Sequence, residues 1–189
     1  MSSGDKALKV IDGSWHMPAT KRNPKTEYLK KHIPDAVFFG IDECCDTTAS
    51  FDHMLPTAAQ FSDYVGKLGI NNDSDVVVYD NNSQFGIFSA QRVWWTFRVF
   101  GHQSVSVLDG GLNRWIAEGY ETTEKLPDIK AQKYVVSKFE GKLVKDFEEI
   151  QKNFEDQEFL VVDARAAGRF DGTAPEPREG NLAMVQVWV

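Results

Sequence analysis

The chain has 189 residues, of which 42 % are hydrophobic and 26 % are charged, and this balance is typical of a globular protein with a sizeable core. It excludes a disordered, collagen-like or coiled-coil protein. The formal net charge of -7 gives no general attraction to nucleic acid or an anionic membrane, and no apolar run approaches the roughly 20 residues of a membrane span. We therefore expect a cytoplasmic protein with no nucleic-acid partner and no membrane partner.

The first quarter of the chain predicts two strands with a helix between them. The apolar segment Leu8–Ile11 predicts the first strand. A helix is expected to begin at Pro24, because Asn23 is a favourable N-cap residue and proline suits the first helical position. The short apolar segment Val37–Phe39 predicts the second strand.

Two amphipathic helices on either side of a buried strand are expected next. Thr57 and Gln60 have the spacing of a capping box at the start of the first helix. The run Val76–Tyr79 is apolar throughout, as expected for a strand buried on both faces of a parallel sheet. The second helix is predicted at Phe88–Phe100 and ends at Gly101.

A further strand at Val105–Leu108 and a short helix at Leu112–Glu118 complete the pattern. Strands that alternate with helices at this spacing predict an α/β domain with a mainly parallel sheet flanked by helices. We place this domain at residues 5–125.

The pattern restarts after a polar stretch. Residues 126–141 contain a proline and predict a linker. A helix at Asp146–Phe154 and a buried strand at Phe159–Val162 are expected after it. Residues 161–165 repeat the apolar strand followed by aspartate that is found at residues 10–15, so a second copy of the domain is expected to start near residue 142.

Several longer motifs resemble those of the tandem-domain rhodanese family. They are Tyr28–Phe39, Asp52–Pro56, Arg92–His102, Val107–Leu112, Gly168–Phe170 and Glu176–Gly180. The first contains HIPDA, which resembles the rhodanese signature HIPGA with Asp35 in place of the glycine. The resemblance implies two rhodanese-like domains, with residues 142–180 a truncated start of the second and residues 181–189 a tail unlike the family.

The resemblance implies sulfur transfer from a small donor, 3-mercaptopyruvate or thiosulfate, to cyanide or to a thiol acceptor, which can be a protein. In that family a cysteine of the second domain carries the sulfur as a persulfide, and no cofactor is required. The corresponding loop of the first domain is Asp80–Ser89, which contains no cysteine, and the second-domain loop would lie beyond Val189. We therefore expect this chain to be inactive by itself, and we leave a mitochondrial location open beside a cytoplasmic one.

Four residues are candidates for the site through this resemblance. Arg169 and Arg178 resemble the pair that holds the carboxylate of 3-mercaptopyruvate, a task that suits the bidentate guanidinium group. The alternative is that both are surface arginines of a proline-rich segment. Asp42 and His53 match positions that form a proton relay with a serine of the second domain. The alternative for this pair is a capping aspartate and a half-buried histidine.

Cys44 and Cys45 are the two cysteines of the chain, and their adjacency disfavours a structural disulfide. We expect reduced thiols, because the neighbouring carboxylates of Asp42, Glu43 and Asp46 raise a thiol pKa. A redox or sulfur-accepting role is the alternative. Neither CxxC spacing nor a companion His/Cys cluster indicates a metal site.

Two functions from other classes remain open beside an inactive sulfurtransferase. The chain is then either a non-catalytic binding or regulatory module, or a truncated product without a function of its own. The end of the family resemblance at Gly180 is compatible with both.

Overall fold

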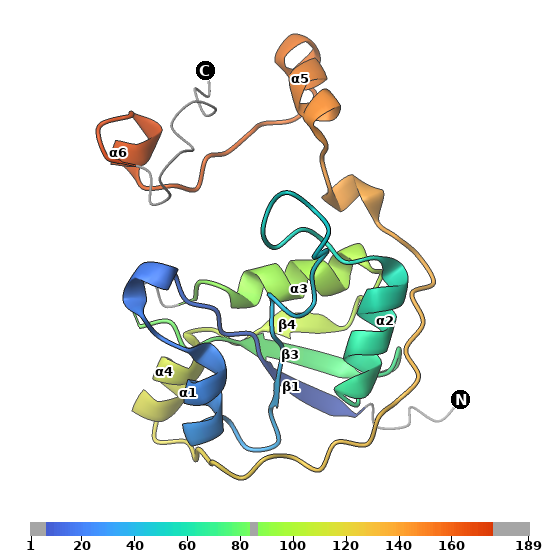
Figure 1. Cartoon of the computed structure of the whole chain (residues 1–189), viewed down its shortest axis with the longest axis vertical. Coiled ribbons are helices and arrows are strands. Elements are labelled where there is room, and N and C mark those ends of the chain that lie inside the picture. The colour runs from blue at the N-terminus through green and yellow to red at the C-terminus, as the bar shows by residue number, and fades with distance from the viewer. Residues whose placement is uncertain (1–6, 84–86, 176–189) are drawn as a thin grey trace. The chain divides into compact units, whose positions relative to one another are not determined.

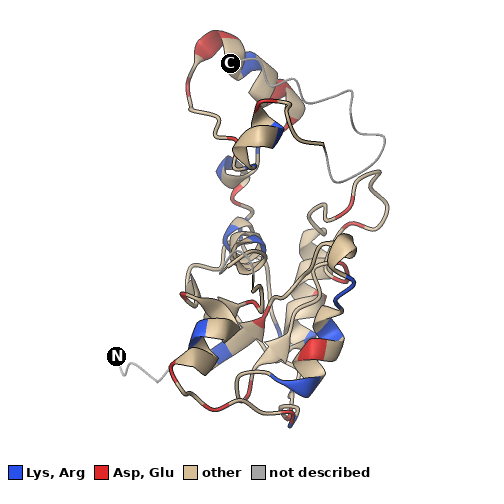
Figure 2. Cartoon of the chain, turned by 90° about the vertical axis from the view of Figure 1, so that its left-hand side faces the viewer, with Lys and Arg blue, Asp and Glu red and all other residues tan. Residues whose placement is uncertain are grey.

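The computed structural model describes residues 7–83 and 87–175 and is drawn in Figure 1. The chain forms two compact units, Met1–Val144 and Lys145–Val189. In the described ranges no helix is long and apolar enough to cross a membrane. Basic and acidic residues are interspersed along the chain (Figure 2).

A four-stranded parallel sheet forms the centre of the first unit. Its strands are β1 (Leu8–Asp12), β2 (Val37–Phe38), β3 (Asp75–Tyr79) and β4 (Val105–Val107), in the order β2-β1-β3-β4. Ile11 lies opposite Val37 on one side and Val78 on the other. This confirms the α/β fold with a parallel sheet. The chain leaves β1 and β3 toward opposite edges, so the strand order reverses between these two strands.

Helices cover both faces of this sheet (Figure 1). They are α1 (Pro24–Lys30), α2 (Ala58–Lys67), α3 (Ala90–Val99) and α4 (Gly111–Ala117), with a short 3-10 helix, η1 (Pro18–Thr20), before α1 and another, η2 (Gly141–Leu143), at the end of the unit. Phe61 of α2 and Phe97 of α3 pack with Val78 in the larger core cluster. Leu112 of α4 packs with Tyr79 in the smaller one.

The predicted helix caps are confirmed. The Asn23 side chain accepts a hydrogen bond from the Thr26 N–H at 2.8 Å. Thr57 and Gln60 exchange both hydrogen bonds of a capping box. Each cap satisfies backbone N–H groups that the helix leaves without an internal partner, so the helices start where the sequence places them.

The segment 120–140, part of which the sequence predicts to be a linker, packs along the rest of the first unit (Figure 1). At one end Thr123 and His32 exchange two backbone hydrogen bonds of 2.9 Å. Farther along, the buried Tyr134 ring contacts Phe61, and its hydroxyl group is hydrogen-bonded to His102 Nδ1 at 3.2 Å. The segment therefore contributes an aromatic side chain to the core.

The second unit contains α5 (Phe147–Asp156) and a short helix, α6 (Ala167–Phe170). Asp146 and Glu149 form a capping box at the start of α5, which confirms the helix predicted there.

The strand predicted at Phe159–Val162 is wrong, because these residues are irregular and Leu160 and Val162 are exposed. Asn153 instead binds both the N–H and the carbonyl group of Phe159, at 2.9 and 2.8 Å. A strand needs a neighbouring strand for its backbone hydrogen bonds, and no described residue supplies one here.

Candidate functional site

Polar side chains gather where β1 and β3 end. Asp12 and Ser14 stand at the end of β1, and Asp80 and Asn81 follow β3. This is the edge at which the strand order reverses, and in open α/β sheets ligands bind at such an edge.

Asp80 fills an anion-binding cradle between β3 and α3. Its Oδ2 accepts hydrogen bonds from the backbone N–H groups of Phe88, Ser89 and Ala90 at 2.7 to 2.8 Å, and its Oδ1 accepts one from Asn82 at 3.0 Å. The side chain is buried. A negative charge at this position is stabilised by the N–H groups and by the dipole of α3.

The same contacts explain where α3 begins. The Ser89 hydroxyl does not cap the helix; it donates to the Gly13 carbonyl at 2.8 Å and accepts a hydrogen bond from the Trp15 N–H at 2.9 Å. The Asp80 carboxylate takes the place of a cap. The same carboxylate accepts from the Phe88 N–H, and α3 starts at Ala90 and not at Phe88 as predicted.

A second carboxyl group, Asp12, is buried close to Asp80. Burial, together with a smaller effect of the Asp80 charge, raises the pKa of Asp12 from 3.8 to about 6, although hydrogen bonds from Ser14 and Tyr79 act in the opposite direction. Compared with the unfolded chain, the folded protein therefore favours the protonated form of Asp12.

Replacing Asp12 with asparagine is expected to alter the pH dependence of stability. The favourable contribution of protonated Asp12 is complete below its unfolded pKa of 3.8 and is lost as the pH rises through about 6. Relative to Asp12→Asn, the wild-type free energy of unfolding should therefore fall by about 2 kcal/mol between about pH 4 and about pH 7. Urea unfolding at both pH values measures this, with the exposed Asp128→Asn as control. Parallel pH curves for wild type and Asp12→Asn would contradict the assignment.

An ion-pair cluster joins the loop after β1 to the loop after β3. Arg22 Nε donates to Glu27 Oε1 at 2.9 Å, and the Arg22 side chain also donates to the Asn81 carbonyl at 3.0 Å. His16 Nε2 lies 3.3 Å from Glu27 Oε2. Burial lowers the pKa of His16, and the hydrogen bond from Arg22 lowers that of Glu27. The cluster fixes both loops at the edge of the sheet.

The structure brings Asp42 and His53 together. Asp42 Oδ1 lies 2.9 Å from His53 Nδ1, although the ring is not aligned for a hydrogen bond. Trp15 Nε1 donates to Asp42 Oδ2 at 3.1 Å, and the Trp15 ring meets the His53 ring edge-on with centroids 5.0 Å apart. Such contacts tighten when a catalytic site fills with ligand, so this geometry is compatible with proton transfer.

The predicted arginine pair is only partly described. Arg169 lies in α6, in the second unit. Arg178 lies outside the described residues. The carboxylate-binding role of the two arginines therefore stays a prediction.

Both cysteines are free thiols whose surroundings oppose ionisation. Burial raises the pKa of Cys44 to about 12. Burial also raises the pKa of Cys45, and the nearby carboxylates of Asp42 and Asp46 act in the same direction. Neither thiol is a favourable nucleophile at neutral pH. Among the described residues no His, Cys, Asp or Glu cluster is suited to a metal ion.

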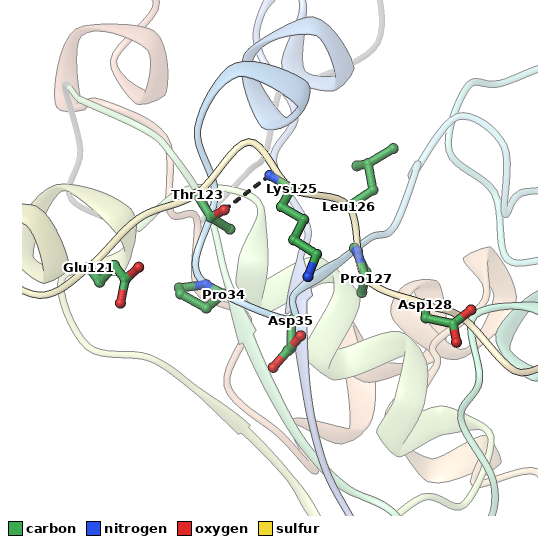
Figure 3. Close-up of a pocket in the computed structure, with 8 residues that line it drawn as sticks. All are labelled: Pro34, Asp35, Glu121, Thr123, Lys125, Leu126, Pro127 and Asp128. Carbon is green, nitrogen blue, oxygen red and sulfur yellow. Dashed lines mark hydrogen bonds between the residues drawn. The ribbon is translucent and has the colours of Figure 1, made fainter.

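A cavity of about 430 Å³ lies outside these clusters (Figure 3). Its lining residues are Pro34, Asp35, Glu121, Thr123, Lys125, Leu126, Pro127 and Asp128. None of the residues that the sequence analysis proposed for the site lines it.

Two residues of the site were not singled out from the sequence. Trp15 contacts both Asp42 and His53, and Arg92 donates a hydrogen bond to the His53 carbonyl. Both residues belong to segments whose apolar pattern predicts packing in the core, so the pattern did not distinguish them as site residues. The polar atoms of their side chains were the one feature that could have indicated a role in the site.

Comparison with known proteins agrees with this architecture. A family model described as a rhodanese-like domain matches residues 4–118. The crystal structure of SseA from Escherichia coli, a 3-mercaptopyruvate sulfotransferase, superposes with a TM-score of 0.77 at 33 % identity, and the match covers 94 % of this chain and 67 % of SseA.

Two relatives are similar over most of the sequence. The 3-mercaptopyruvate sulfurtransferase of Rattus norvegicus is 47 % identical over 174 residues, which are 92 % of this chain and 58 % of that protein. The thiosulfate sulfurtransferase of Cricetulus griseus is 47 % identical over 170 residues, which are 90 % of this chain and 56 % of that protein. The chain thus spans a little over half the length of these relatives.

Proposed function

Because this chain belongs to the rhodanese family, we propose that it forms the non-catalytic part of a sulfurtransferase that uses 3-mercaptopyruvate or thiosulfate as donor. A cysteine of a second rhodanese-like domain carries the sulfur, and a thiol or cyanide accepts it. By itself the chain does not turn over.

One observation carries the non-catalytic assignment. The loop that corresponds to the family's cysteine loop holds its backbone N–H groups around an anion, as a thiolate or persulfide would require, but that anion is the Asp80 carboxylate. Because these N–H groups are already hydrogen-bonded to Asp80, they are not available to stabilise a sulfur nucleophile. Cys44 is buried and Cys45 lies among carboxylates, so neither thiol replaces it.

Asp42 and His53 are proposed to supply proton transfer to the site of the second domain. With Nδ1 facing a carboxylate, Nε2 is the ring nitrogen that remains to accept a proton from a hydroxyl group of that domain. Arg169 and Arg178 are proposed to bind the donor carboxylate, which favours 3-mercaptopyruvate over thiosulfate.

A binding or regulatory module is the second candidate. Phe147, Leu160 and Val162 are each at least 74 % exposed, and exposed apolar side chains of this size favour association with a partner. Size-exclusion chromatography with co-purification tests this candidate. A monomer without a partner would count against it.

The sulfurtransferase proposal is tested on protein from the native source. Antibodies raised against this chain should isolate a polypeptide heavier than 21.3 kDa that converts 3-mercaptopyruvate or thiosulfate, while the isolated chain should not. Turnover by the isolated chain, or an inactive heavier polypeptide, would contradict the proposal. Cytoplasmic and mitochondrial locations are both compatible with this function, and fractionation of source cells distinguishes them.

A further inference from the structure

A single indole ring contacts both Asp42 and His53. Trp15 Nε1 donates a hydrogen bond of 3.1 Å to Asp42 Oδ2, while Asp42 Oδ1 faces His53 Nδ1 at 2.9 Å. The planes of the indole and the imidazole meet at 81°. The position of Trp15 therefore affects the carboxylate and the imidazole together.

Trp15 is itself anchored at the start of α3. Its backbone N–H donates to Ser89 Oγ at 2.9 Å, and its ring stacks on Phe88 with centroids 6.3 Å apart. The Asp42 side chain, in contrast, is 66 % exposed, and an exposed carboxylate held by nothing else samples several rotamers. The anchored indole N–H restricts the direction in which Asp42 points.

Arg92 acts on the backbone of His53. This histidine has a φ of 62°, in the left-handed region that residues other than glycine rarely adopt. The Arg92 guanidinium, which lies 4.7 Å from the centroid of the Trp95 ring, donates a hydrogen bond to the His53 carbonyl. A charge-assisted hydrogen bond from an ordered side chain stabilises such a strained backbone.

We propose that Trp15 and Arg92 are positioning residues that hold His53 as the Nδ1–H tautomer, directed at Asp42, and keep Nε2 available as the proton acceptor. The role in proton transfer rests on the proposed function. The tautomer is part of the proposal. Asp42 Oδ1 lies 2.9 Å from Nδ1 without an aligned hydrogen bond, and a carboxylate only accepts hydrogen bonds, so a small rotation of the ring toward Asp42 favours a proton on Nδ1.

The test observes the His53 ring in the ¹⁵N-labelled full chain, at a pH where the ring is neutral. Long-range ¹H–¹⁵N spectra report which ring nitrogen carries the proton. Trp15→Phe retains an aromatic ring but removes the indole N–H together with part of the ring system, so the ratio of Nδ1–H to Nε2–H should fall about fivefold. Trp115→Phe is the matched control, since it removes an indole hydrogen bond of 2.7 Å to the Glu121 carbonyl.

Arg92 is tested by a pair of variants. Arg92→Met removes the donor to the His53 carbonyl and should lower the same ratio, whereas Arg92→Lys retains a charged donor and should restore part of it. If Trp15→Phe does not fold, Arg92→Met and Arg92→Lys alone test the proposal.

An unchanged tautomer ratio in either Trp15→Phe or Arg92→Met would overturn the proposal, as would an equal change in Trp115→Phe. Trp15→Phe should also have no further effect once Asp42→Asn has removed the carboxylate. Because no sulfur transfer is measured, failure of the proposed function leaves these spectra unchanged, and the two claims fail separately.

Discussion

Replacing Asp80 with alanine is expected to lower the free energy of unfolding by about 3–5 kcal/mol. The substitution removes the acceptor of four backbone N–H groups, those of Asn82, Phe88, Ser89 and Ala90, within a buried site. These donors then lack both a partner and the negative charge that stabilises the start of α3. Urea unfolding followed by circular dichroism measures the loss.

Two further variants define the origin of this effect. Asp80→Asn retains one carbonyl oxygen for the three N–H groups at the start of α3 but presents an amide N–H to Asn82, so it should lose less than Asp80→Ala. Asp128→Ala changes an exposed aspartate and should lie within about 0.5 kcal/mol of wild type. If the Asp80→Ala protein were as stable as the Asp128→Ala protein, the hydrogen bonds to Asp80 would not stabilise the fold and the prediction would be wrong.

The second large effect concerns activity. In the heavier polypeptide that we propose contains this chain, His53→Asn is expected to lower kcat with 3-mercaptopyruvate by roughly 10²–10⁴-fold, the contribution of a well-placed general base. Asparagine tolerates the positive φ of position 53 and keeps a polar side chain, so the loop should retain its fold. Steady-state kinetics across pH measure the change.

Stability is the control for this substitution. The His53 side chain is 25 % exposed and outside the main core cluster, so His53→Asn should change the free energy of unfolding by less than about 1 kcal/mol. A normal kcat in a folded His53→Asn enzyme would show that His53 takes no part in proton transfer. A fall in kcat that only accompanies unfolding would make the residue structural.

Local signals were sufficient for most of the first unit. The unbroken apolar run at Val76–Tyr79 predicted a central parallel strand, and β3 does lie between β1 and β4. Asn23 and Thr57 predicted the starts of α1 and α2, because a cap is a contact between residues three apart in the sequence. Such contacts are visible in a single stretch of sequence.

Features that depend on distant residues were missed or misplaced. Phe159–Val162 has the composition of a strand, but a strand is defined by its neighbour, and here Asn153 binds the Phe159 backbone instead. Tyr134 joins the core across a long loop by packing on Phe61.

In the candidate site, too, some residues could be predicted from the sequence and others could not. The resemblance to rhodaneses selected Asp42 and His53, and the structure places them 2.9 Å apart. The partners of this pair, Trp15 and Arg92, come from the loop after β1 and from α3, and only the folded structure brings them there. The filled cradle at Asp80 likewise depends on N–H groups from residues eight to ten positions farther along the chain.

The most direct test is to locate the sulfur during turnover. The native polypeptide is supplied with 3-mercaptopyruvate, its persulfides are trapped by alkylation, and the modified cysteines are identified by peptide mass spectrometry. We predict a persulfide on a cysteine outside these 189 residues and none on Cys44 or Cys45, whose surroundings raise their thiol pKa values. A persulfide on either of these two residues, formed and consumed at the rate of turnover, would contradict the account.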